Sequence, residues 1–246
     1  MPTIVAMCGR FVTTSPAAQV AAYFDAEVTS ERLLEAAPNY NVAPTTEVAV
    51  VVERGGRRGL ALRRWGLVPS WAKEAAVGSK MINARVETAA TKPSFRSAFA
   101  SRRCILPVDG FYEWRAAGPD GPKQPFFITR RDREPLAFAG LWESWRDPGA
   151  PDGAPPLLTC SILTTEASGP VAQVHHRMPV LLGPDVWDPW LDESLTDKEQ
   201  VQGLVQPAPE DLLEVWPVST AVNSVRNKGP ELLEPVGPAD GPGTLF

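Results

Sequence analysis

The 246-residue sequence predicts an α+β fold with a mainly antiparallel sheet that is closed or half-closed. Short apolar and β-branched runs, separated by Gly, Pro and Asp turns, dominate the middle of the chain. Helical patterns are few and short, and 26 prolines and 8 tryptophans indicate loops and turns rather than a helical bundle. No internal repeat or convincing linker divides the chain, so we expect a single domain.

Two short helices open the chain. Ser15 and Pro16 suit the N-cap and first position of a helix that runs through Phe24. A second helix, from residue 29 or 30, ends at Pro38. The next segments are predicted to be irregular at 39–44, a strand at 47–53, a Gly-Gly turn, a return strand at 59–65, and a loop at 65–71 with two exposed tryptophans.

The rest of the chain alternates strands with turns. We expect a helix at 93–101, strands at 104–108, 110–115, 125–130 and 136–142, a surface loop at 147–156, strands at 157–164 and 174–182, a helix at 197–205 and a strand at 213–218.

Charge and cysteine content exclude several classes of protein. The formal net charge of −5 does not indicate a nucleic-acid binder, so any phosphate contact must come from a local basic cleft on an acidic body. Three cysteines without a CxxC pair argue against a disulfide framework or a zinc site and favour a reducing cytoplasm. No apolar run reaches membrane-spanning length, and Met1–Ala6 is too short for a signal peptide.

A cysteine near the start of the chain is the first candidate for chemistry. If translation starts at Met7 and an aminopeptidase removes that residue, Cys8 becomes the N-terminus. Its α-amine, with a reference pKa of about 7.7–8.0, is then partly unprotonated at neutral pH. With an aldehyde the amine forms a Schiff base and the thiol closes a thiazolidine ring. Taken alone, the pattern is equally compatible with no catalytic role. N-terminal nucleophile amidohydrolases also begin with Cys. The other two cysteines, Cys104 and Cys160, are expected to be buried strand residues.

Two further motifs carry polar groups that suit a site. Asn83 and Arg85 lie two positions apart, so on an extended segment they point the same way. A capped helix start with a surface Arg explains them equally well. Glu113 stands between large aromatics, where burial would raise its carboxyl pKa and make it a general acid. On periodicity alone, an outward-facing Glu is favoured.

The only histidines, His175 and His176, precede Arg177 in a Pro-bounded segment, where they are either structural or able to touch phosphate or shuttle a proton. Spacing alone does not choose between the two. Basic and aromatic residues are also interleaved in predicted loops, a pattern that single-strand binding proteins use. These residues are Arg10, Trp71, Arg85, Arg177 and Lys228.

Ordered motifs give the chain a resemblance to a known family. They are Met-Cys-Gly-Arg-Phe at 7–11, Tyr-Asn-Val-Ala-Pro at 40–44, Trp-Gly-Leu-Val-Pro-Ser-Trp at 65–71, Asn-Ala-Arg-Val-Glu-Thr at 83–88, Arg-Cys-Ile-Leu-Pro-Val-Asp-Gly-Phe-Tyr-Glu-Trp at 103–114, His-His-Arg-Met-Pro at 175–179, Pro-Val-Ser at 217–219 and Val-Asn-Ser-Val-Arg-Asn-Lys-Gly at 222–229. Over residues 7–236 the sequence resembles the SOS-response-associated peptidase (SRAP) family, whose members shield abasic sites in single-stranded DNA.

The resemblance implies roles for individual residues. Cys8 would form the thiazolidine with C1′ of the ring-opened abasic sugar, and Asn83 would orient its amine. Glu113 would be the acid/base for sugar opening and carbinolamine dehydration. His175 would bind near the lesion phosphate and assist ring opening or crosslink reversal, which leaves His176 at a variable position. The implied DNA-binding residues are Arg10, Arg85 and Arg177 on phosphates, Trp71 as a wedge or stacking ring, and Asn41 and Pro44.

The leading segment departs from the family pattern. We expect Met7 to be the true start. Self-removal of Met1–Met7, through peptidase chemistry of Cys8 and Glu113, is the second explanation, and a blocked, inactive Cys8 is the third. The implied organisation is a leader at 1–7 absent from the mature chain, a SRAP domain at 8–236 with a barrel-like β core and flanking short helices, and a disordered tail at 237–246.

The implied protein is a cytoplasmic, nucleoid-associated monomer whose partner is single-stranded DNA with abasic sites, including DNA at replication forks, and it needs no cofactor or metal. Two alternatives remain. An N-terminal-cysteine amidohydrolase or peptidase would act independently of DNA. A non-covalent single-strand binding module would not depend on Cys8.

Overall fold

The structure of the protein, a computed structural model, describes residues 9–116 and 121–237. Cys8, the leader at 1–7 and the tail from 238 lie outside the described residues. Two sheets form the fold, and their strands are mainly antiparallel. None of the helices within the described ranges is long and apolar enough to cross a lipid bilayer. The predicted α+β class is confirmed.

The larger sheet closes on itself. Its strands follow the order β11, β10, β7, β4 and β5, and β5 then pairs in parallel with β11 through Thr159–Arg64 and Cys160–Trp65. This closure confirms the barrel-like core. The barrel strands are β4 (Glu47–Arg54), β5 (Arg57–Trp65), β7 (Arg103–Val108), β10 (Leu136–Trp145) and β11 (Leu157–Glu166), and the short strands β2 (Glu27–Val28), β6 (Asn83–Arg85) and β12 (Arg177–Pro179) join them.

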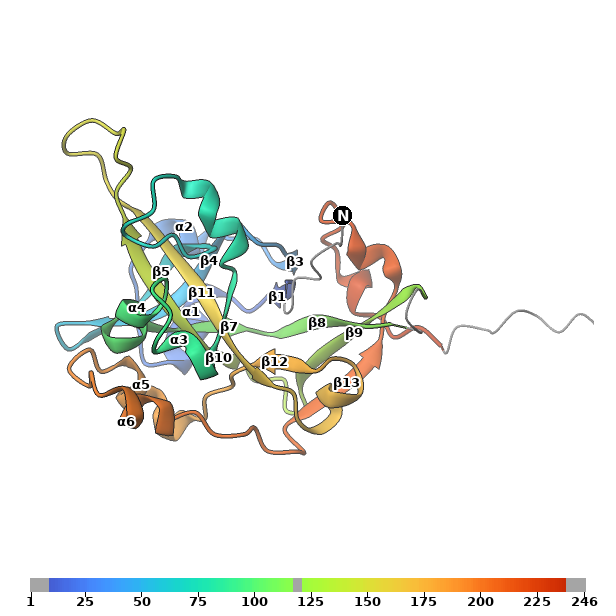
Figure 1. The fold of residues 1–246 in the computed structure, drawn as a ribbon. Coiled ribbons are helices and arrows are strands. Elements are labelled where there is room, and N and C mark those ends of the chain that lie inside the picture. Colours follow the sequence, from blue (N-terminus) through green and yellow to red (C-terminus); the bar gives the residue numbers. More distant parts are fainter. Residues whose placement is uncertain (1–8, 117–120, 238–246) are drawn as a thin grey trace, which may run out of the picture.

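The second sheet runs away from the barrel to the right of Figure 1, where the long β8–β9 hairpin is clearly visible. The order of its strands is β13 (Leu213–Pro217), β9 (Lys123–Arg130), β8 (Gly110–Ala116), β1 (Phe11–Thr13) and β3 (Asn39–Val42). The first strand of the chain is therefore internal to this sheet, between β8 and β3.

Short helices cover the outside of the barrel, around a buried cluster that includes Phe24, Leu60, Phe99 and Trp190. They are α1 (Ala17–Tyr23), α2 (Glu31–Leu34), α3 (Val86–Ala89), α4 (Arg96–Ser101), α5 (Trp187–Leu191) and α6 (Lys198–Gly203). The 3₁₀ turns are η1 (Ala75–Lys80), η2 (Gly169–Gln173), η3 (Pro184–Val186), η4 (Thr220–Asn223) and η5 (Pro230–Leu233).

Several predicted elements match the structure closely, and a few are wrong. Residues 39–44 were expected to be irregular, but 39–42 form β3 because β1 supplies its hydrogen-bonding partner, with Phe11 opposite Val42. The expected strand at 174–182 is reduced to β12, preceded by η2. Trp65 was expected to be exposed but is fully buried, since its indole N–H donates to Ile82 O at 2.8 Å inside the core.

Candidate functional site

The start of β1 lies beside Glu113. Phe11 pairs with Phe111 and Val12 with Gly110, and the Tyr112 N–H donates to Arg10 O at 3.0 Å. Continuing this antiparallel register places Gly9 opposite Glu113 on β8. The residue bonded to Gly9 in the sequence is Cys8. The fold therefore brings the described end of the N-terminal strand to the predicted acid/base.

The same strand is linked to Asn83 through the core. The Phe11 ring packs against Trp65 with 4.8 Å between centroids, and the Trp65 indole binds the carbonyl of Ile82, the neighbour of Asn83. Asn83 and Arg85 lie on one side of β6, whereas Ala84 between them is buried. The structure agrees in part with both interpretations of this motif. Asn83 and Arg85 belong to a short extended strand, and Arg85 is also an exposed residue at the N-cap of α3.

Glu113 is 1% exposed, so the outward-facing interpretation favoured by periodicity is wrong. Its strand β8 lies between β1 and β9. Both faces of β8 are covered, since Phe111 belongs to the cluster shared with the barrel and Tyr112 to a cluster on the opposite face. Over residues 110–113, which are all buried, alternation between an apolar and a polar face cannot indicate an exposed side.

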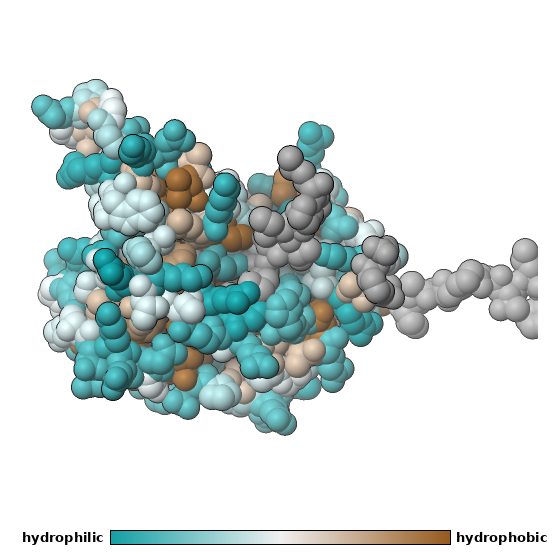
Figure 2. Space-filling model, in the orientation of Figure 1, coloured by the Kyte–Doolittle hydropathy of each residue, from teal (hydrophilic) through white to brown (hydrophobic). Residues whose placement is uncertain are grey.

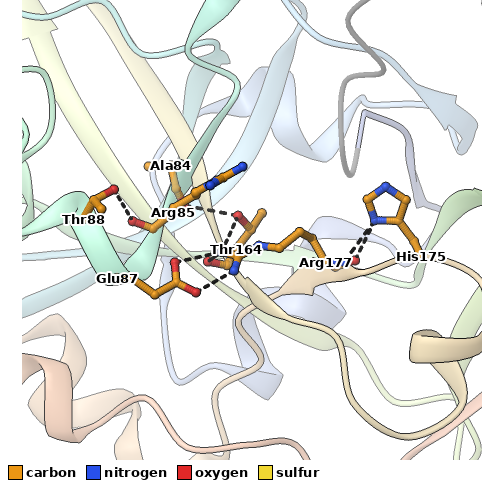
Figure 3. Close-up of polar contacts among 7 residues, drawn as sticks. All are labelled: Ala84, Arg85, Glu87, Thr88, Thr164, His175 and Arg177. Atoms are coloured by element: carbon orange, nitrogen blue, oxygen red, sulfur yellow. Dashed lines mark hydrogen bonds and ion pairs between the residues drawn. The ribbon is translucent and has the colours of Figure 1, made fainter.

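His175 is half-buried, and its Nδ1 faces the backbone of Arg177. The Arg177 N–H lies 3.1 Å from Nδ1, and the Arg177 carbonyl oxygen is also at 3.1 Å. Figure 3 shows these contacts on one side of the ring, with the second ring nitrogen turned away from them. Neutral His175 can accept from the amide, and protonated His175 can donate to the carbonyl. Both protonation states have a partner without a change of position.

Burial lowers the pKa of His175, and the nearby charges of His176, Lys123 and Arg177 act in the same direction, against the backbone contact with Arg177. The neutral imidazole is therefore the main form at pH 7. The ring of His176 lies 4.4 Å away and is exposed.

Arg177 is 8% exposed and points away from His175, toward α3. Its two terminal nitrogens bind the Glu87 carboxylate at 2.5 and 2.9 Å, and Nη2 also donates to Thr164 O at 2.6 Å. The hydrogen bond from Arg177 is the main effect that lowers the pKa of Glu87, and a backbone hydrogen bond and the charges of Arg177 and Arg85 add to it against the opposing effect of burial. Sequence reasoning missed Glu87, although it lies within the quoted motif at 83–88.

Arg10 and Asn41 hold a late segment of the chain rather than facing outward. Arg10 donates to Val222 O and to Asn41 Oδ1, both at 2.9 Å, and burial lowers its pKa. Asn41 is 1% exposed, and its amide nitrogen lies 3.2, 3.0 and 2.9 Å from the carbonyl oxygens of Val222, Ser224 and Asn227. The role of these carbonyls is invisible in the sequence, because any residue supplies one.

The other predicted DNA-contact residues are more accessible. Trp71 is 61% exposed, Arg85 is exposed, and Pro44 is half-buried. A hydrogen bond holds the loop that carries Trp71 against the rest of the fold: the indole N–H of Trp145 donates to Ala72 O at 2.7 Å. Figure 2 shows one side of the molecule as mostly hydrophilic, with scattered hydrophobic residues.

The two other cysteines and one cavity do not belong to the candidate site. Cys104 and Cys160 are buried as expected, and desolvation raises the pKa of both thiols, that of Cys104 to about 12. A cavity of about 380 Å³ near α1, α2 and β4 is lined by none of the predicted catalytic residues. Within 9–116 and 121–237, no group of three or more His, Cys, Asp or Glu side chains is arranged to hold a metal ion.

Comparison with known proteins assigns the family. The chain matches the family described as SOS response associated peptidase (SRAP) over residues 7–225. It is 41% identical to the abasic site processing protein YoqW of Bacillus subtilis, covering 93% of this chain and 99% of that protein. Identity to the abasic site processing protein YedK of Escherichia coli is 33%, over 94% and 100% of the two chains. The abasic site processing protein HMCES of Gallus gallus is 35% identical, over 81% of this chain and 66% of that protein.

Solved structures have the same fold. A protein from Bacteroides thetaiotaomicron superposes with a TM-score of 0.82 at 24% identity, over 93% of this chain and all of that one. A phage-related protein from Bordetella bronchiseptica gives a TM-score of 0.65 at 30% identity, over 86% of this chain and 94% of that one. The family match over residues 7–225 and the identity to full-length relatives lead to one conclusion. The chain belongs to the SRAP family.

Proposed function

We propose that this protein senses abasic sites in single-stranded DNA and forms a covalent thiazolidine crosslink to them through an N-terminal Cys8, which protects the lesion during the DNA damage (SOS) response. The relatives' names as abasic site processing proteins support the substrate. The observation that carries the chemistry is the register of β1, which, continued back by two residues, places Gly9 opposite the buried Glu113. The proposed nucleophile, Cys8, is therefore the sequence neighbour of the residue placed opposite the proposed acid/base.

Cys8 must be the first residue of the active form, because only a free α-amine forms a Schiff base. The family match begins at Met7, which supports a start at that methionine followed by its removal. Hydrolysis of the Met7–Cys8 bond by the protein itself is the second route. In that route water adds to the carbonyl of Met7, the bond to the Cys8 nitrogen breaks, and a proton passes to that nitrogen.

The crosslinking reaction balances with loss of one water. The amine of Cys8 adds to the C1′ aldehyde of the ring-opened sugar and gives a carbinolamine. Loss of water leaves an iminium, the thiolate attacks C1′, and the nitrogen keeps one hydrogen in the five-membered ring. Glu113 donates and accepts the protons of sugar opening and dehydration.

Asn83 and His175 are the other catalytic residues of the proposal. Asn83 orients the amine with its side-chain amide, from a strand joined to β1 through Phe11 and Trp65. Because burial lowers the pKa of His175, its imidazole is mainly neutral at pH 7, and the ring has a backbone partner in either protonation state. It is suited to accept or return a proton near the lesion phosphate.

The DNA strand is held by a surface around this centre. Arg85 contacts a phosphate directly, and Trp71 stacks on a base beside the lesion, with Pro44 completing the surface. Arg10 and Arg177 add positive charge close to the strand, but their guanidinium groups are already bound to protein groups. Asn41 supports the surface from beneath.

A denaturing gel tests the proposal. Single-stranded DNA carrying one abasic site is incubated with a chain starting at Met7 and with the Cys8→Ala and Cys160→Ala variants. We expect a slow-migrating crosslink from the parent chain and from Cys160→Ala, and none from Cys8→Ala. A crosslink that survives Cys8→Ala would contradict the mechanism. No crosslink, together with hydrolysis of amide substrates, would assign the protein to N-terminal-cysteine amidohydrolases.

A further inference from the structure

The segment Val222–Lys228 is a sequence motif to which the proposed chemistry assigns no role. It begins within η4 and ends before η5, at the right of Figure 1. Val222 is fully buried, and all six residues that follow it are exposed, including Val225 at 47%. We call residues 223–228 the anchored loop.

Three strands of the second sheet hold the anchored loop, one side chain from each. Asn41 of β3 bonds to Ser224 O and Asn227 O at 3.0 and 2.9 Å. Arg10, at the start of β1, binds Val222 O at 2.9 Å and Asn223 O at 3.5 Å.

The third side chain comes from β8. The Trp114 indole N–H donates to Asn223 Oδ1 at 2.8 Å. Below these contacts, Val222 packs in a cluster with Val12 and Tyr112.

Two of the three holding residues are close in sequence to the proposed catalytic ones. Arg10 is two residues from Cys8, and Trp114 is adjacent to Glu113. Exposed loops are normally more mobile than the elements that they connect. This one is hydrogen-bonded to Trp114 of β8, the strand that carries Glu113, so a ligand bound to it has a defined position relative to the proposed acid/base.

The chemistry of the anchored loop fits the DNA backbone. It carries two cations, Arg226 and Lys228, and no acidic residue. Neither cation forms an ion pair with any residue of 9–116 or 121–237. The acidic residues nearest in sequence, Glu231 and Glu234, come after the loop, in and beyond η5. On a body with a net charge of −5, such a local cation pair suits a polyanion.

We propose that the anchored loop is a second DNA-contact element, in which Arg226 and Lys228 bind backbone phosphates of the strand flanking the lesion and thereby set the position of the lesion at the catalytic centre. This inference rests on the proposed function for the identity of the DNA. In this proposal the anchored loop contributes to DNA affinity and to the position of the lesion, and its side chains take part in no chemical step.

Equilibrium binding of short, undamaged single-stranded DNA, followed by fluorescence anisotropy, tests the loop without requiring a crosslink. The Arg226→Gln/Lys228→Gln variant is compared with the wild type and with Arg57→Gln/Lys198→Gln, which removes the same charge from the β4–β5 hairpin and from α6. We expect the loop variant to bind about tenfold more weakly, with a slope of log K against log salt that is shallower by about 1.4, or about 0.7 per phosphate contact. The control should keep the wild-type slope.

The crosslinking assay separates this proposal from the proposed function. A wild type that crosslinks, with a loop variant of unchanged affinity and salt slope, would overturn the loop proposal alone. An equal loss in both charge variants would also overturn it, since the effect would then follow net charge. Weakened binding by the loop variant, with no crosslink from the wild type, would support the loop and reject the covalent mechanism. The loop variant should also unfold at the wild-type urea midpoint, because both cations are exposed.

Discussion

Nη1 of Arg10 donates to Oδ1 of Asn41 at 2.9 Å, so two residues expected to meet DNA hold each other and a shared backbone segment. The contact joins β3 to the start of β1 and leaves the amide nitrogen of Asn41 for three carbonyl groups. It makes Asn41 a structural residue in the sheet that carries Glu113.

Asn41→Ala should therefore lower stability. The substitution removes the Asn41 partner of the Val222, Ser224 and Asn227 carbonyls and one acceptor of the Arg10 guanidinium, at a cost of about 2–3 kcal/mol in the free energy of unfolding. Asn39→Ala is the matched control, since Asn39 is half-buried and its side chain only accepts a bond from the Asn41 N–H, and it should cost about 1 kcal/mol or less. Urea denaturation measures both. Equal losses of unfolding free energy in the two variants would show that Asn41 does not hold the 222–227 segment.

The two tryptophans of the 65–71 motif should behave in opposite ways. Trp65→Ala should destabilise the fold by about 3–5 kcal/mol, because it removes a fully buried ring. Trp71→Ala should change stability by no more than about 0.5 kcal/mol, but weaken binding of single-stranded DNA by about 1–3 kcal/mol through lost stacking. Urea unfolding and DNA titration of both variants check this. Unchanged DNA affinity in Trp71→Ala would remove Trp71 from the contact surface.

The sequence predicts most of the regular elements but not which of their residues are exposed. Hairpins with Gly turns and helices with Pro or Ser starts have local signals, and β4, β5 and α1 lie close to the expected positions. Burial depends on which strands become neighbours. Trp65 and Trp71 look alike in the sequence, yet only Trp65 finds a carbonyl partner inside the barrel.

The candidate site shows the same limit. Glu113 could not be placed by alternation, because β8 is covered on both faces. The contacts of Arg10 and Asn41 with residues 222–227 span about two hundred positions of sequence and use backbone carbonyls. No pattern in the sequence encodes them. The bidentate pair of Glu87 and Arg177 likewise forms only when α3 and β12 meet.

Glu87→Gln should weaken the protein, with a defined dependence on pH. Its carboxylate pairs with the Arg177 side chain, which is 10% exposed, and since the Glu87 side chain is 47% exposed, we expect a loss of only about 1–2 kcal/mol at pH 7. The folded-state pKa of Glu87 is lowered, so its contribution is present above the unfolded value of 4.5 and is lost as pH falls through the folded pKa. Urea unfolding at pH 7 and pH 3 should show the difference shrinking, whereas Glu35→Gln, an exposed control, should match the wild type at both. A pH-independent loss would contradict the ion-pair account.

The rate of crosslinking should depend on the protonation of His175. Because the pKa of His175 is lowered, its neutral form persists below pH 6.5. The fall in crosslinking rate that follows protonation of His175, the acid limb of the pH profile, should therefore lie below pH 6.5. His176→Gln removes one of the charges that lower the pKa, and should move the limb slightly toward higher pH. His175→Gln should abolish the limb. Single-turnover rates between pH 5 and 8 measure all three, and an unchanged limb in His175→Gln would assign it to another group.

In the proposed function Cys8 reacts as an N-terminal residue, and the intact mass of the DNA crosslink shows whether it does. A chain starting at Met1 and a chain starting at Met7 are each incubated with single-stranded DNA carrying one abasic site, and the adducts are weighed. We expect the chain starting at Met7 to give an adduct whose mass equals the chain beginning at Cys8 plus the DNA minus one water. The longer chain should give the same adduct if it is trimmed, and no molecule that retains Met7 should give one. An adduct that retains residues 1–7 would contradict the thiazolidine mechanism.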